Sequence, residues 1–295
     1  MELNSEVVTT PPRPAATVVI LRDTTDDEAG LEVLLLKRHG LSEVLGGAFV
    51  FPGGKVDLAD TQLDSASHLD QSLQSLHTGL GEPDIEPLTA ASLYVAAIRE
   101  AFEESGVLFA QGATVEHAKQ AAALLKEGLT FGAMLSHMGL RLQSAQLLPW
   151  SRWITPQVPS VTNKRFDTRF FVATLPATQI ARHDNHETTE SVWLTPRRAL
   201  ALYWESKIEL APPQIMSLVS LERHRSVAGV MQAARQRPPP VIAPEPFDHE
   251  GSRIICYPGD ERHSVRIQHL PGPTRLIYRN KRFEPIAGFE SLFVD

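Results

Sequence analysis

The sequence predicts an α/β protein, and three observations lead to this. Short β-branched runs dominate the first 60 residues, helical spacing takes over at Leu88–Gly106, and strand-like runs alternate with helical ones from Ser151 onward. Strands separated by helices in this way are typical of a sheet covered by helices. With 295 residues, 42% of them hydrophobic, the chain is long enough to bury a large core.

The N-terminal part predicts a β-hairpin followed by a third strand. Ala15–Leu21 and Leu31–Leu36 are apolar runs on either side of a turn rich in Asp and Gly at 23–30. A third apolar run, Ala48–Phe51, follows a pair of glycines and ends at a proline. We therefore expect the front of the protein to be rich in strands.

A helix is expected after a less regular stretch. Residues 60–87 mix Ser, Gln, Asp and Leu without a steady period, so we expect a loop with at most one short helix there. From Leu88 to Gly106 the side chains of Tyr94, Ile98 and Phe102 recur every four residues. Because a glycine is the usual residue just past a helix end, the predicted helix stops at the last residue of this range.

The second half of the chain predicts further strands and helices. Helices are expected at Val115–Glu127, Phe131–Met138, Pro196–Tyr203 and Pro213–Gln236, and strands at Ser151–Ile154, Thr168–Ala173 and Ser191–Leu194. Pro238–Pro240 then ends regular structure. The tail from Val241 carries short strand-like runs, and the sequence leaves open whether it packs on the domain or contacts a partner.

Composition excludes several classes of protein. A net charge of −7 excludes a global basic field for nucleic acid, and the single cysteine, Cys256, excludes an intramolecular disulfide and any multi-cysteine metal site. No apolar run approaches the roughly 20 residues that span a bilayer, and the N-terminus lacks the apolar segment of a secretory signal. We expect a cytoplasmic protein without membrane or nucleic-acid partners, and a homodimer is left open.

A cluster of carboxylates carries the strongest chemical signal. Glu100, Glu103 and Glu104 lie at i, i+3 and i+4 of the predicted helix and share one face. Like charges at this spacing repel, which a bound cation would relieve, and ligands that are all oxygen atoms suit Mg²⁺ or Mn²⁺. Arg99 can hold one of these glutamates in place. A solvated acidic face is the alternative, but the residues around the cluster favour a metal site.

The string from Arg99 to Val107 resembles the signature of the Nudix hydrolases, G-x5-E-x7-R-E-u-x-E-E-x-G-u. Gly54 corresponds to the first glycine, and Asp60 stands where the family usually has glutamate. Between Asp60 and Arg99 lie 38 residues rather than seven, which is an insertion of 31. The metal-binding half of the signature is complete, and the first acidic position is in doubt.

Other segments narrow the resemblance to a long-insert Nudix subgroup that includes peroxisomal coenzyme A diphosphatases. The matching segments are Phe49–Asp57, Trp153–Pro156, Arg165–Phe171 and Glu190–Pro196. The resemblance implies an α/β/α sandwich with a mixed sheet in residues 14–236, after a flexible tail at 1–13 and before a C-terminal extension at 237–295. The insertion, about 61–87, is expected to protrude near the mouth of the site and to select part of the substrate.

The resemblance also implies an activity, the metal-dependent hydrolysis of a nucleoside diphosphate derivative such as coenzyme A or an acyl-coenzyme A. Glu100, Glu103 and Glu104 would hold Mg²⁺ or Mn²⁺ together with the backbone carbonyl of Gly53. Glu100 would also take part in proton transfer, and Arg99 would orient the cluster. The bound ion would bridge phosphate oxygens and activate a water molecule.

Further residues are candidates for proton transfer and substrate binding. Glu187 and Glu190, just before a predicted strand, are candidates for the general base. The basic residues expected to contact substrate phosphates are Arg38, Lys55, Arg165 and Arg169.

Two other functions compete with hydrolysis. A non-catalytic nucleotide-sensing module would keep the fold and lose the chemistry, which the complete set from Arg99 to Glu104 disfavours. An isopentenyl-diphosphate isomerase-like enzyme typically depends on an active-site cysteine, and the only cysteine, Cys256, lies far downstream.

Overall fold

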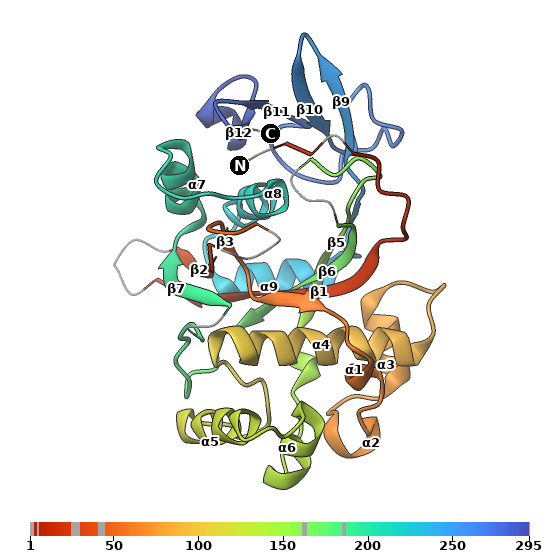
Figure 1. Cartoon of the computed structure of the whole chain (residues 1–295), viewed down its shortest axis with the longest axis vertical. Helices are drawn as coiled ribbons and strands as arrows, with labels where there is room; N and C mark the ends of the chain where they lie inside the picture. Colours follow the sequence, from red (N-terminus) through yellow and green to blue (C-terminus); the bar gives the residue numbers. More distant parts are fainter. Residues whose placement is uncertain are drawn as a thin grey trace.

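A mixed sheet built around one long strand, β1, forms the centre of the molecule (Figure 1). The computed structural model describes residues 3–4, 6–24, 30–40, 45–160, 164–184 and 187–294. In these ranges eight strands join in the order β3-β2-β1-β6-β5-β8, with β4 also on β1 and β7 on β2. The strands are β1 (Arg13–Asp23), β2 (Leu31–Arg38), β3 (Phe49–Val50), β4 (Gly53–Lys55), β5 (Leu148–Ile154), β6 (Phe166–Thr174), β7 (Thr188–Leu194) and β8 (Val241–Ile242).

The pairing of these strands confirms the predicted hairpin and the mixed sheet. β1 runs antiparallel to β2 and β4 and parallel to β6. Within the predicted turn at 23–30, residues 25–29 lie outside the part of the chain that the structure describes. β1 pairs with β4 at its N-terminal end and with β2 at its C-terminal end. The two glycines of β4, Gly53 and Gly54, therefore lie beside the central strand of the sheet.

Helices cover both faces of the sheet. Val18 and Ile20 of β1 belong to one apolar core, and Val19 and Leu21 belong to the other, as the alternation of a strand requires. α4 (Pro87–Ser105) packs on the first face, and α9 (Val227–Gln236) packs on the second with α7 (Pro196–Trp204) and α8 (Pro212–Leu221). The predicted α/β/α sandwich is confirmed (Figure 1).

The insertion is more regular than the sequence predicts. Instead of a loop with at most one short helix, it contains α2 (Ser65–His68) and α3 (Leu73–Leu80), just after α1 (Leu58–Thr61). Leu76 and Leu80 of α3 are buried against α4. The insertion therefore packs along α4 and does not protrude as expected. The helix α2 has only four residues and an irregular segment separates it from α3, so no single period runs through this stretch of the sequence.

The remaining helices largely follow the prediction, with one correction. α5 (Val115–Lys126) and α6 (Phe131–Met138) lie where expected, on the far side of α4 from the sheet (Figure 1). The expected single helix at Pro213–Gln236 is wrong, because the chain forms α8 and α9 with a break between them. Ser226 accepts a hydrogen bond from the Gly229 N–H at 3.2 Å and so starts a new helix.

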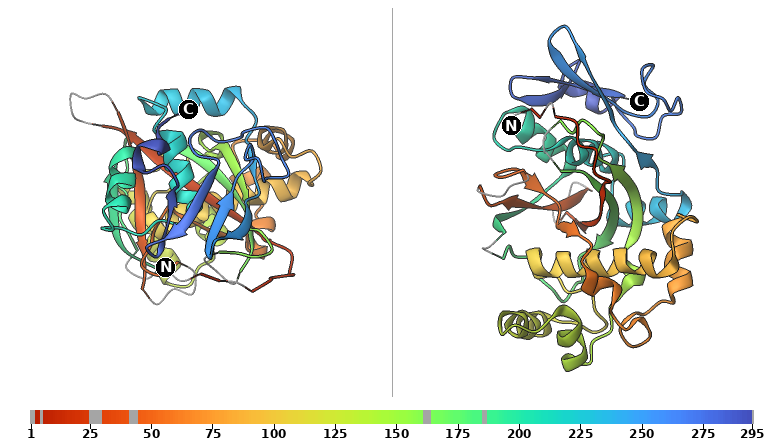
Figure 2. Two further views of the ribbon diagram at one scale, coloured as in Figure 1. Left: turned by 90° about the horizontal axis from the view of Figure 1, so that it is seen from above. Right: turned by 45° about the vertical axis from the view of Figure 1, so that its right-hand side comes forward.

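The C-terminal extension packs on the domain, which resolves the alternative that the sequence leaves open. Its strands form a second, antiparallel sheet from β9 (Glu245–His249), β10 (Ser252–Cys256), β11 (Arg275–Arg279) and β12 (Arg282–Pro285). The Tyr203 hydroxyl of α7 donates to the Phe283 carbonyl at 2.7 Å and accepts from the Phe283 N–H at 2.9 Å. Figure 2 shows this sheet at the opposite end of the molecule from α5 and α6.

The N-terminal tail and the helix lengths complete the description. The Asn4 N–H donates to the Ser160 carbonyl at 3.1 Å and the Val8 N–H donates to the Gln157 carbonyl at 2.7 Å, so the described part of the tail lies along residues 157–160. Within the described ranges, every helix falls short of the length or the apolar content that a membrane-spanning helix needs.

Candidate active site

The helix α4 presents the acidic cluster to the sheet. Pro87 occupies its first turn, where a missing N–H costs nothing, and Gly106 ends it with φ +68°. The middle of the helix, residues 90–99, is buried throughout, with its apolar side chains in the core on the first face of the sheet. Its last turn therefore lies against the strand β4, with Arg99 and the three glutamates beside the signature glycines.

Asp60 fills the position that the sequence leaves in doubt. Its carboxylate accepts two hydrogen bonds from the Arg99 guanidinium, Nε to Oδ1 at 2.8 Å and Nη2 to Oδ2 at 2.9 Å. The side chains of Asp60 and Arg99 are only 2% and 9% exposed. Although 31 extra residues separate Asp60 from Arg99 in the sequence, the two side chains are in direct contact. Asp60 therefore orients Arg99.

Arg99 also binds two of the glutamates, as the sequence predicts for at least one of them. Its Nη1 donates to Glu100 Oε1 at 2.8 Å and to Glu103 Oε2 at 3.0 Å. One guanidinium thus fixes the rotamers of three carboxylates. We call Asp60, Arg99, Glu100, Glu103 and Glu104 the acidic centre.

The glycines of β4 allow the acidic centre to approach the sheet. The Gly53 N–H donates to Glu104 Oε2 at 2.9 Å. A Cβ on Gly54 would lie 2.5 Å from Glu100 Oε1, and a Cβ on Gly53 would lie 2.5 Å from Thr17 Oγ1. A side chain at position 53 would therefore push β4 away from the backbone of β1, and one at position 54 would displace the Glu100 carboxylate that Arg99 holds.

Burial changes the acidity of the centre. It raises the pKa of Glu100 to about 7, although Arg99 acts in the opposite direction, and it raises the pKa of Glu104 to about 8 against the hydrogen bond from Gly53. The pKa of Glu103 is also raised, again chiefly by burial. Burial therefore favours the protonated, neutral form of these carboxyl groups, and ionising all three together would require a further positive charge nearby.

The donor set fits a hard divalent cation, since it consists of carboxylate oxygens from three neighbouring glutamates on α4. Among the described residues, however, no group of three or more His, Cys, Asp or Glu side chains converges tightly enough to enclose a metal ion. Arg99 Nη1 binds the inner oxygens of Glu100 and Glu103. A cation held by both glutamates would compete with this nitrogen.

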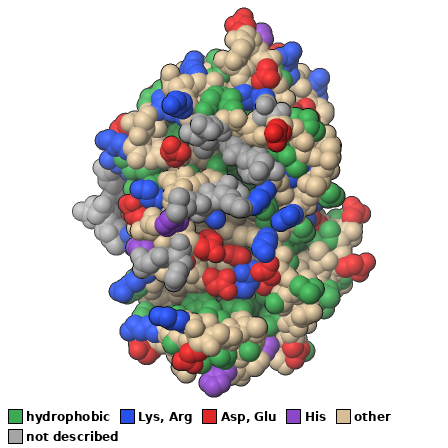
Figure 3. Space-filling model, in the orientation of Figure 1, with side chains coloured by type: hydrophobic (Ala, Val, Ile, Leu, Met, Phe, Trp, Pro, Cys, Tyr) green, Lys and Arg blue, Asp and Glu red, His purple; other side chains and the backbone are tan. Residues whose placement is uncertain are grey.

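The acidic centre opens into a cavity of about 760 Å³, which we call the main cavity. Figure 3 shows acidic side chains gathered around basic ones in the middle of this face. One side of the main cavity is lined by Arg99, Glu100 and Glu103, and the volume is within the range of sites that bind small molecules.

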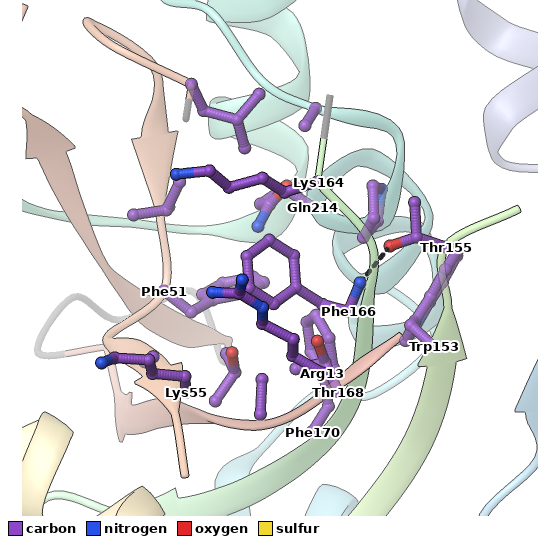
Figure 4. A pocket seen from close by; sticks show the side chains of 18 of the residues that line it. Arg13, Phe51, Lys55, Trp153, Thr155, Lys164, Phe166, Thr168, Phe170 and Gln214 are labelled. Carbon is purple, nitrogen blue, oxygen red and sulfur yellow. Dashed lines mark hydrogen bonds between the residues drawn. The ribbon is translucent and has the colours of Figure 1, made fainter. Parts of the chain in front are cut away.

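The opposite side of the main cavity is aromatic. Phe51, Trp153, Phe166 and Phe170 line it, and we call these four residues the aromatic wall (Figure 4). The Phe166 N–H donates to Thr155 Oγ1 at 3.1 Å, which fixes the start of β6. Pro244 and Ile255 of the C-terminal extension also line the main cavity, so residues outside the signature complete it.

Two of the four predicted substrate-binding cations line the main cavity. Arg38 and Lys55 do so, and the buried Nε of Arg38 has no hydrogen-bond partner within the described residues. Because a buried N–H group without a partner is unfavourable, a ligand with an oxygen acceptor, such as a phosphate, would be favoured next to Arg38. Arg13 and Lys164 also line the cavity and were missed by the sequence interpretation (Figure 4).

The other two predicted cations do not reach the main cavity. Arg165 donates to the Thr155 carbonyl at 3.1 Å, and the buried Arg169 donates to Glu82 Oε1 of the insertion at 2.9 Å. Side chains alternate along β6, so Phe166, Thr168 and Phe170 face the cavity while the odd-numbered residues face away. This alternation was the signal that could have found the aromatic wall from the sequence.

Of the two candidate general bases, one lies at the site. Glu187 lines the main cavity, and its charge contributes to the raised pKa of Glu100, after burial and the closer charges. Glu190 lies on β7 opposite Lys37, with its Oε2 3.5 Å from Lys37 Nζ, and does not line the cavity. Cys256, which an isomerase-like mechanism would need, is buried in β10, where burial raises the pKa of its thiol to about 11.

Comparison with known proteins gives a consistent result. The family model of the NUDT19 Nudix domain matches residues 12–221. The acyl-coenzyme A diphosphatase NUDT19 of Xenopus laevis is 30% identical over 272 residues, which cover 78% of this chain and 70% of the frog protein. The protein of the same name from Homo sapiens is 26% identical over 235 residues, covering 68% of this chain and 62% of the human one.

A solved structure is similar in fold. The crystal structure of a NUDIX hydrolase from Alicyclobacillus acidocaldarius aligns with a TM-score of 0.61 and 26% identity, covering 76% of this chain and 97% of that one. The matched family segment contains β1 to α8 and the whole acidic centre. The chain therefore belongs to the Nudix family of pyrophosphohydrolases.

Proposed function

We propose that this chain hydrolyses the diphosphate bond of coenzyme A or of an acyl-coenzyme A, using Mg²⁺ or Mn²⁺. One observation carries the proposal: the acidic centre opens directly into a main cavity whose other side is aromatic and whose rim is basic. A nucleoside diphosphate derivative has the matching parts, an aromatic base and an anionic diphosphate. The relatives named acyl-coenzyme A diphosphatase support this choice of substrate.

Glu100, Glu103 and Glu104, with the Gly53 carbonyl, would hold the metal ion. When bound, a divalent cation neutralises charge on the diphosphate oxygens and lowers the pKa of an attacking water molecule. The role of Arg99 and Asp60 is to hold the glutamates ready, because their ion pair is buried and does not depend on the metal.

Glu187 is the proposed general base. It lines the main cavity and is exposed enough to exchange protons with solvent, its side chain being 65% exposed. In the proposed step Glu187 takes a proton from water, the water oxygen bonds to one phosphorus, and the bridging oxygen leaves with the other phosphate. The products are two phosphate monoesters, and the proton on Glu187 passes to solvent.

The rim and the aromatic wall would hold the nucleotide. Arg38 supplies an unsatisfied buried donor to a phosphate oxygen, and Lys55 lies on the β4 side of the cavity. Phe166, which is only partly buried, offers a face on which a base can stack. A cytoplasmic location and the absence of nucleic-acid partners stay predictions of the sequence, and the sequence leaves a homodimer open.

The proposal is tested by incubating the purified protein with coenzyme A, acetyl-coenzyme A, ADP-ribose and diadenosine tetraphosphate, with Mg²⁺, with Mn²⁺ or with EDTA. Mass spectrometry should find 4′-phosphopantetheine or its acyl form as a product that requires the metal. Glu187→Gln should lower kcat, whereas the matched variant Glu190→Gln should not. Binding of coenzyme A without hydrolysis would instead support a sensing module, and hydrolysis of none of the four compounds would refute the proposed function.

A further inference from the structure

A second hollow adjoins the acidic centre. It has a volume of about 270 Å³, and we call it the side hollow. Asp57, Arg99 and Glu103 line both the side hollow and the main cavity, so the two spaces meet at the acidic centre. A molecule whose diphosphate lies on the acidic centre therefore has room on both sides of it.

The side hollow changes in character along its length. Its end at the acidic centre is polar, with the carboxylates of Asp57, Asp60 and Glu103. The residues that line it beyond that centre are mostly apolar and come from the insertion and from the α5–α6 segment; they include Leu63, Leu125, Leu129 and Phe131. Figure 3 shows hydrophobic side chains directly below the acidic patch.

The charge of the side hollow limits what it can bind. Arg99 is the only Lys or Arg among the described residues that line it, and its guanidinium is already bonded to Asp60, Glu100 and Glu103. A phosphate or a carboxylate entering this space would face Asp57, Asp60 and Glu103 without a compensating cation. An uncharged chain meets no such barrier.

We propose that the side hollow binds the group on the far side of the diphosphate from the nucleoside, and that this group is an uncharged chain with polar atoms near the phosphate and apolar atoms further out. The inference rests on the proposed function and adds a direction to it: the nucleoside occupies the main cavity and the leaving chain occupies the side hollow. It also explains what the insertion contributes, because Leu63 forms part of the apolar lining.

The substitution Leu129→Trp tests the proposal. Leu129 lines the side hollow and is only partly buried, so a larger side chain at this position can fill the hollow. The matched control is Leu58→Trp, because Leu58 lies on the neighbouring helix α1, is 73% exposed and lines neither space. Two substrates are compared, coenzyme A and a 3′-phosphoadenosine diphosphate that carries only a methyl group on its outer phosphate. Calorimetry with 4′-phosphopantetheine and Mg²⁺ gives a readout that does not require turnover.

We expect Leu129→Trp to lower kcat/KM for coenzyme A at least tenfold and to leave the methyl ester within a factor of two. The variant should also weaken 4′-phosphopantetheine binding at least tenfold, while Leu58→Trp changes neither quantity. Equal loss on both substrates, or no loss of 4′-phosphopantetheine binding, would overturn the inference even though the wild type still hydrolyses coenzyme A. Failure of the wild type to hydrolyse any diphosphate would instead refute the proposed function.

Discussion

The two sides of the main cavity differ in how their residues are distributed along the chain. The acidic side comes almost entirely from one turn of α4, and its geometry is set by ion pairs with Arg99. The aromatic wall is assembled from β5, β6 and the residue after β3, and residues of the C-terminal extension also line the main cavity. This difference suggests a division of labour, in which the acidic side determines kcat and the aromatic side determines KM.

The largest expected effect comes from breaking the ion pair that supports the acidic side. Asp60→Ala leaves the buried Arg99 without its bidentate partner, and we expect a loss of about 4 kcal/mol in the free energy of unfolding. Urea denaturation followed by circular dichroism measures it. The exposed neighbour Leu58→Ala should stay within about 0.5 kcal/mol of the wild type, and an equal loss there would contradict the assignment.

Removing one charge from the acidic centre should affect kcat and spare KM. Glu103→Gln keeps the shape of the side chain, and we expect kcat with Mg²⁺ to fall about 100-fold, equivalent to about 3 kcal/mol. Steady-state kinetics on coenzyme A separates the two constants, and an unchanged melting temperature shows that the fold is intact. Full activity in both Glu103→Gln and Glu104→Gln would exclude the proposed metal ligands.

The acidity of the centre predicts a pH dependence of stability in the absence of metal. Because the pKa values of Glu100 and Glu104 are raised to about 7 and about 8, the folded state binds more protons than the unfolded state as pH rises above about 4.5. The free energy of unfolding should therefore fall from about pH 5.5 to about pH 8, by a few kcal/mol at most.

Urea titrations in EDTA at these two pH values measure the change. Glu104→Gln, which cannot ionise, should flatten the dependence, and Mg²⁺ should stabilise the wild type more at the higher pH. If the metal-free protein were instead more stable at the higher pH, the prediction would be wrong. Protein side chains such as Arg99 would then suffice to stabilise the ionised carboxylates without a metal ion.

The smallest effect is expected on the aromatic side. Phe166→Ala removes one face of the aromatic wall, and we expect KM for coenzyme A to rise about tenfold with kcat nearly unchanged, as for the loss of one stacking contact. Phe247→Ala is the matched control, because Phe247 lies on β9 and lines neither space. A fall in kcat that matches Glu103→Gln would remove the distinction between the two sides.

The same difference explains what the sequence could predict. The acidic side is local in sequence: the spacing of Tyr94, Ile98 and Phe102 predicts the helix, and the spacing of the three glutamates on it predicts the cluster. Asp60 stayed in doubt because its contact with Arg99 spans 39 positions, and only the tertiary fold brings the two together. The predicted helices α4 and α5 rest on periodicity over three or more turns, whereas α2 of the insertion has only four residues. The helix α3 is as long as the predicted α6, but it lies in a stretch of mixed polar and apolar residues without a steady period.

The aromatic wall could be predicted only in part. Phe166 and Trp153 belong to segments that stand out in the sequence, yet the basic neighbours Arg165 and Arg169 drew the substrate assignment to the wrong face of β6. Trp153 lines the cavity but is mainly a packing residue, since its ring lies 6.2 Å from that of Phe170 and 6.0 Å from that of Tyr257. Pro244 and Ile255 carry no motif, so sequence spacing gives no reason to place them at the site.

The position of Ile255 bears on how far a working fragment of this protein can be shortened. The family match ends at residue 221, before α9 and the whole C-terminal extension. A fragment cut there would lose Val230 and Met231, which cover the second face of the sheet, and would leave the main cavity without part of its wall. The smallest fragment that keeps the whole lining of the main cavity is therefore longer than the segment by which its family is recognised.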